Sequence, residues 1–136
     1  MNRIATLVGG TLLVGVSALG LSSPSRTMSP NTKTVKVHCR NGNNAPFVTP
    51  KQVRLSVGDT LIWTGDGTVL PDSIAISLKP NQPAWPFRGS PPSGGGAVTT
   101  GDATTKGTVQ YNATIKCRVP GGGQQWETID PDIIID

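Results

Sequence analysis

An unbroken alternation of apolar and polar residues near the C-terminus is the feature that most constrains the fold of this chain. From Val109 to Val119, every second residue is apolar or cysteine, and the residues between them are polar or basic. A period of two places successive side chains on opposite faces of a strand, so this segment predicts a long strand with one buried face. Shorter apolar runs, most with the same period, predict further strands at 35–40, 53–57, 60–63, 74–78, 97–99 and 133–135.

Glycine and proline divide these runs from one another. The chain has 17 glycines and 12 prolines in 136 residues, and no segment has the 3.6-residue period of an amphipathic helix. Short alternating runs separated by turn residues are typical of two packed sheets. We therefore predict an all-β, antiparallel Greek-key sandwich that forms a single domain over residues 35–136, with a long Pro/Gly-rich loop at 79–106.

The N-terminal segment has the pattern of an export signal. Arg3 precedes an uncharged apolar run from Ile4 to Leu21, and small residues follow at the end of the run. This pattern predicts a secretory signal peptide at 1–21, and the Ser-, Thr- and Pro-rich residues 22–34 then form a disordered leader. The alternative is a retained membrane anchor, which the glycines in the run disfavour. We expect a secreted or periplasmic protein with no membrane span in the mature chain.

The cysteine count fits an exported protein. Cys39 and Cys117 are the only two cysteines. In an oxidising compartment, an even number of cysteines predicts a disulfide. A redox-active pair is the alternative, but such pairs are usually close in sequence, as in C-x-x-C. We expect a structural Cys39–Cys117 bridge.

Two segments resemble a known family. In the first, Val53, Leu55 and Val57 lead through Gly58-Asp59 into a strand that ends at Trp63, as in the strand-turn-strand of cupredoxins, the blue-copper proteins. In the second, the stretch 107–111, followed by Cys117, a glycine turn and a final strand, is similar to their C-terminal half. The resemblance covers residues 35–136 and implies a cupredoxin-like sandwich. An immunoglobulin-like sandwich, which uses similar alternation, is the alternative.

Copper is the cofactor that this resemblance suggests, and counting ligands argues against it. A blue-copper site needs two imidazoles and a thiolate, usually with a weak methionine ligand. The chain has one histidine, His38, and it lies in the first strand rather than near the C-terminal loop. We therefore expect no metal, no cofactor and no catalytic residue, with His38 as a surface residue.

Basic residues lie on the polar faces of two strands. Lys36, His38 and Arg40 share one face of the first strand, and Lys116 and Arg118 share one face of the long strand. If the two strands are neighbours in one sheet, these side chains form a single basic patch for an anionic glycan or an acidic protein partner. If the disulfide crosses the sandwich instead, the two groups lie on opposite faces. The net charge of +4 is too small to indicate nucleic-acid binding.

The long loop contains the other candidate partner-binding residues. Trp85, Phe87 and Arg88 place two aromatic rings and a cation in a proline-rich stretch. Exposed, they would anchor a partner, because Trp and Arg are enriched among binding hot spots. Folded back, they would cover the open end of a small core.

The sequence therefore predicts an exported, non-catalytic binding or structural module whose partner is unknown. One alternative is a metal-binding or electron-transfer protein with a site that is not recognisable in the sequence. Another is an assembly subunit that pairs with a neighbouring molecule through a sheet edge, using the first strand or the strand at Ile133–Ile135.

Overall fold

The structure is a computed structural model that describes residues 20, 29–66, 69–119 and 121–136; for residues 69–73 it describes the backbone only. The predicted signal peptide at 1–21, apart from Gly20, and residues 22–28 of the predicted leader lie outside the described residues. No helix occurs in the described ranges. The strands are β1 (Thr32–His38), β2 (Phe47–Thr49), β3 (Gln52–Leu55), β4 (Thr60–Gly65), β5 (Val69–Leu78), β6 (Ser93–Gly94), β7 (Ala97–Thr99), β8 (Gly107–Arg118), β9 (Gln124–Ile129) and β10 (Asp132–Ile135).

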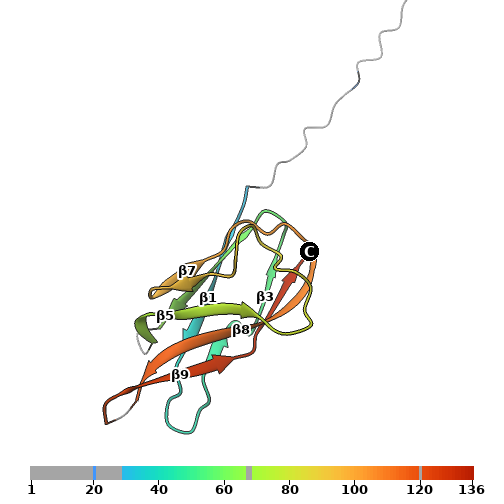
Figure 1. The fold of residues 1–136 in the computed structure, drawn as a ribbon. Coiled ribbons are helices and arrows are strands. Elements are labelled where there is room, and N and C mark those ends of the chain that lie inside the picture. The colour runs from blue at the N-terminus through green and yellow to red at the C-terminus, as the bar shows by residue number, and fades with distance from the viewer. Residues whose placement is uncertain (1–19, 21–28, 67–68, 120) are drawn as a thin grey trace, which may run out of the picture.

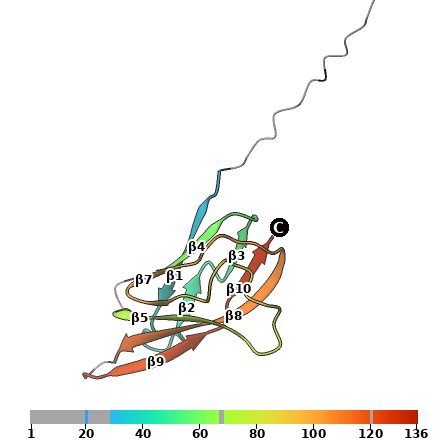
Figure 2. The ribbon, with the colours of Figure 1, turned by 45° about the horizontal axis from the view of Figure 1, so that its top comes forward.

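The strands form two packed sheets, which confirms the predicted all-β sandwich. One sheet has the order β2-β1-β4-β7. The other has the order β3-β10-β8-β5-β6. In this second sheet, β8 also pairs with β9, which is not part of that linear order. Figures 1 and 2 show β8 and β9 running side by side at one end of the molecule, away from the C-terminus.

The sheets are mixed rather than wholly antiparallel, which differs from the prediction. β1 pairs with β4 in parallel, and β10 pairs with β3 in parallel. Strand direction is not visible in the alternation of one strand, because both kinds of pairing place successive side chains on opposite faces.

The predicted strands are present, and three further strands were not predicted. β2, β6 and β9 are the additions. β1 begins at Thr32, three residues before the expected start, so part of the predicted leader is ordered by pairing with β4. Both strands named in the assembly alternative have a neighbour on each side in the described chain: β1 lies between β2 and β4, and β10 lies between β3 and β8.

The inward residues of both sheets form one core. Trp63 of β4 and Tyr111 of β8 are fully buried at its centre with their rings in an edge-to-face arrangement. The Trp63 Nε1–H donates a hydrogen bond to the Tyr111 hydroxyl over 2.8 Å. Burial raises the pKa of Tyr111, so this hydroxyl stays protonated at physiological pH.

Asp59 joins the start of β1 to the turn between β3 and β4. One carboxylate oxygen accepts a hydrogen bond from the backbone N–H of Ser56, and the other accepts one from the N–H of Asn31, both over 2.9 Å. The side chain is buried. These two donors, Ser56 first, lower the pKa of Asp59 because they stabilise its charged form. The Gly-Asp bend predicted from the sequence therefore also fixes the entry into β1.

The long loop folds back on the sandwich. Phe87 is 3% exposed and forms an isolated bridge with Ala103. Trp85 packs against the core with its ring 5.1 Å from that of Phe87. Both aromatic rings of this segment therefore pack on the core. In the ranges described, no helix is long and apolar enough to cross a membrane.

Candidate binding groove

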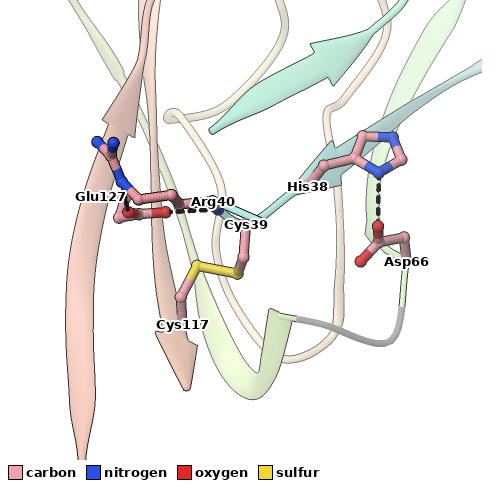
Figure 3. The surroundings of a disulfide bond; sticks show 6 residues. All are labelled: His38, Cys39, Arg40, Asp66, Cys117 and Glu127. Carbon is pink, nitrogen blue, oxygen red and sulfur yellow. Dashed lines mark hydrogen bonds and ion pairs between the residues drawn. A yellow bond between two sulfur atoms is a disulfide. The ribbon is translucent and has the colours of Figure 1, made fainter. Parts of the chain in front are cut away.

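The disulfide joins the two sheets at one end of the sandwich. Cys39 follows the last residue of β1, and Cys117 lies near the end of β8, so the predicted Cys39–Cys117 bridge links a strand of each sheet. The two Cα atoms are 5.8 Å apart. Figure 3 shows that three consecutive residues diverge here: Cys39 and Arg40 turn toward β8 and β9, and His38 turns away from them.

Arg40 holds a buried carboxylate beside the bridge. Its Nε–H donates to one oxygen of Glu127 over 3.1 Å, and its backbone N–H donates to the other over 3.0 Å. The Glu127 side chain is 6% exposed and that of Arg40 is 55% exposed. The two contacts fix β9 to the segment after β1 and neutralise the buried charge, which would be costly to leave unpaired.

His38 supports an aromatic ring on the other side of this segment. Its Nδ1 lies 2.5 Å from a carboxylate oxygen of Asp66. Its ring stacks on that of Phe47 with centroids 4.3 Å apart and planes 9° from parallel. The orientation of Phe47, which is 47% exposed, therefore depends on a histidine held by a carboxylate.

A groove of about 560 Å³ runs between β2 and β9. Ala45, Pro46, Phe47 and Val48 line one side, and residues 125–130 line the other. Its walls include two of the three large apolar side chains that are exposed in the described chain, Phe47 and Trp126. A volume of this size lies within the range of roughly 300–1,000 Å³ that is typical of ligand sites.

Basic side chains surround the groove. Arg40 and Lys51 line it, and the Lys116 ammonium lies 5.3 Å from the centre of the Trp126 ring. Arg118 lines an adjoining cavity of about 230 Å³, which shares Arg40 and Glu127 with the groove. The acidic residues of the groove are already paired, Glu127 with Arg40 and Asp130 with Lys79. Among the described residues, no carboxylate lies within ion-pair distance of Lys51, Lys116 or Arg118.

The single basic patch predicted for neighbouring strands does not form. β1 carries Lys36 and His38, and β8 carries Lys116 and Arg118. These strands belong to different sheets, so the disulfide crosses the sandwich. Lys36 is exposed on the sheet that contains β1. Arg40 is the exception: it lies beyond the end of β1 and turns toward β9, so it lines the same small cavity as Arg118.

The loop residues predicted to bind a partner lie elsewhere. Phe87 is buried, and Trp85 is half-buried against the core. Arg88 is exposed and forms an ion pair with Asp102 over 3.6 Å. Of these three residues, Phe87 belongs to the core, Trp85 packs against it, and Arg88 is exposed.

One group of potential metal ligands occurs in the described residues. It consists of Cys39, Cys117 and Glu127, whose ligand atoms all lie within 4.8 Å of one another. The disulfide takes up both sulfur atoms, and Arg40 takes up the carboxylate. In this oxidised state the group does not offer thiolates to a metal.

Sequence reasoning missed Phe47, Lys51 and Trp126 as site residues. Phe47 lies in a three-residue strand, and Trp126 lies in β9, where three consecutive exposed residues interrupt the alternation. The groove arises from the packing of two sheets, so only a knowledge of which edges meet identifies its walls. Neither a comparison with protein-family models nor a search of curated proteins finds a match to this chain.

Proposed function

We propose that this chain is an exported, non-catalytic binding module on a cupredoxin-like scaffold without copper, and that the groove between β2 and β9 binds an anionic partner. The observation that carries the proposal is the combination of exposed aromatic rings and unpaired cations around one groove. Phe47 and Trp126 offer apolar contact area, while Lys51, Lys116 and Arg118 offer charge. Exposed aromatic rings of this size, flanked by polar residues, are typical of interaction sites.

The disulfide supports export. A bridge between two distant cysteines persists in oxidising compartments and is rare in reducing ones. It also lies beside the groove, where it fixes the segment that carries Arg40.

A non-catalytic role is supported by the surroundings of the one histidine. Catalysis by His38 would require a ring nitrogen within reach of a nucleophile or substrate. The Nδ1 atom is engaged by Asp66, and the Nε2 atom is buried without a hydrogen-bond partner among the residues described. The absence of a second imidazole in the sequence also supports a scaffold without a blue-copper site.

Retention on an anionic matrix tests the proposal. We expect Lys51→Glu/Arg118→Glu to elute at clearly lower salt than the wild type, because it reverses two unpaired charges around the groove. The control is Lys33→Glu/Lys36→Glu, which makes the same change in net charge on exposed residues of β1. Equal loss of retention in both variants would mean that net charge alone governs binding, which would contradict the proposal.

A further inference from the structure

β9 is an open strand edge that faces the groove. Within the described chain it pairs only with β8. Ala113 lies opposite Ile129 at one end of this pairing, and Arg118 lies opposite Gln124 at the other. Six consecutive residues, 125–130, line the groove. Since the side chains of a strand alternate between its faces, an unbroken run of lining residues means that the backbone of β9 itself borders the groove.

β9 also lacks the features that usually protect an edge. Proteins block such edges with short strands, prolines or charged side chains, because unpaired N–H and C=O groups invite another strand. β9 has six residues with no proline, lysine or arginine, and the charge of Glu127 is turned inward to Arg40. The other edge strands are shorter, with two to four residues in β2, β3, β6 and β7.

The opposite wall restricts what can enter. β2 pairs only with β1 in the described ranges, and Pro46 and Pro50 flank it. Pro46, Phe47 and Lys51 line the groove on this side, and residues 125–130 line it on the side of β9. An occupant pairs with β9 and places its side chains against this wall.

Charge selects among the possible occupants. The unpaired groups around the groove are cations, whereas its carboxylates are already neutralised. A second copy of this chain, which carries a net charge of +4 before processing, would add like charge. An acidic glycan would satisfy the cations, but it has no backbone that matches the repeat of a strand edge.

We propose that an extended acidic segment of a protein partner binds in the groove as an added strand on β9. This inference rests on the proposed function and specifies its ligand class. The added backbone supplies hydrogen bonds to β9, and acidic side chains on the peptide contact Lys51, Lys116 and Arg118. Phe47 and Trp126 cover the peptide at the two sides of the groove.

Three synthetic octapeptides of alternating Glu and Thr, with blocked ends, test this inference against the full mature protein. The first peptide is unmodified. The second has N-methyl groups on every second residue, which blocks one edge of the extended peptide and leaves the other free. The third has the same number of N-methyl groups distributed over both edges. Strand addition predicts that the second peptide binds like the first and that the third binds about tenfold more weakly or worse. A tenfold loss of affinity corresponds to the loss of only one or two net hydrogen bonds to β9.

Amide hydrogen exchange of β9 provides the second readout. Binding of the unmodified peptide should slow exchange at alternate amides within 125–129, and an acidic hexuronate oligosaccharide should leave them unchanged. If all three peptides bind equally, or the unmodified peptide binds while the β9 amides remain unprotected, strand addition is wrong and the proposed anionic site stands. If neither probe binds, both proposals are wrong. Protection that depends on protein concentration alone would identify a second copy as the occupant and overturn the inference.

Discussion

Replacing both cysteines with alanine removes the covalent link between the two sheets. The bridge closes a loop with a sequence separation of 78 residues. The chain-entropy model for a loop of this length gives about 4.5 kcal/mol of stabilisation, because the bridge lowers the entropy of the unfolded chain. Domains of this size have a total free energy of unfolding of roughly 5–15 kcal/mol, so we expect Cys39→Ala/Cys117→Ala to lose a large share of the total.

Urea denaturation at neutral pH, followed by far-ultraviolet circular dichroism, measures this loss. We expect the free energy of unfolding to fall by about 3–4.5 kcal/mol, since strain and residual structure reduce the chain-entropy value. The m-value should rise, because an unlinked unfolded chain exposes more surface than a cross-linked one. Wild-type protein in the presence of a reductant is the matched control, and it should approach the same midpoint.

A small effect would refute the reasoning. If the double variant loses less than about 1 kcal/mol and keeps the same m-value, the bridge does not constrain the unfolded chain as the loop length implies. Equal unfolding curves for oxidised and reduced wild type would refute the presence of the bridge itself.

Three substitutions test the packing around the core. Tyr111→Phe should cost about 1–3 kcal/mol in urea denaturation, because it leaves the buried Trp63 Nε1–H without an acceptor. Asp59→Asn should cost about 2 kcal/mol at pH 7, because the hydrogen bonds that lower the pKa of Asp59 favour its charged form. That stabilisation is fully present above the unfolded pKa of about 3.9 and is lost as the pH falls through the lower folded pKa. The difference in stability between wild type and variant should therefore shrink on acidification. A difference that is constant with pH would contradict this origin. Gly101→Ala should cost about 1–3 kcal/mol because its Cβ would overlap a backbone carbonyl oxygen, whereas Gly96→Ala, which has open space, should be nearly neutral.

The strand pattern of this chain is predictable where burial is one-sided and continuous. In β8, five inward residues from Val109 to Cys117 alternate with outward ones, and both the strand and its buried face were predicted from this period. The disulfide was predicted as well, because the count of two cysteines leaves one pairing. These features depend on local spacing or on composition, which the sequence contains directly.

The short and irregular strands are not predictable in the same way. β2 has three residues, and the alternation in β9 is interrupted by exposed residues at Gln124, Gln125 and Trp126. Their strand conformation comes from pairing with β1 and β8, so it depends on tertiary contacts rather than on local preference. Because these two strands form the groove, the candidate site was missed together with them.

The basic residues illustrate the same limit for function. The sequence indicates which of Lys36, Arg40, Lys116 and Arg118 share a strand face, but it does not specify which sheet each strand joins. The crossing disulfide separates Lys36 from Lys116 and brings Arg40 close to Arg118. Topology therefore decides which cations act together.

A nuclear magnetic resonance titration of the 15N-labelled protein with a short poly-glutamate peptide tests the proposed binding site most directly. We predict that shift changes concentrate at Arg40, Phe47, Lys51 and residues 125–129, and that the Trp126 indole shifts more than those of Trp63 and Trp85. Changes confined to Lys33 and Lys36 on the other sheet, or no changes at millimolar peptide, would contradict the assignment of the groove as the binding site.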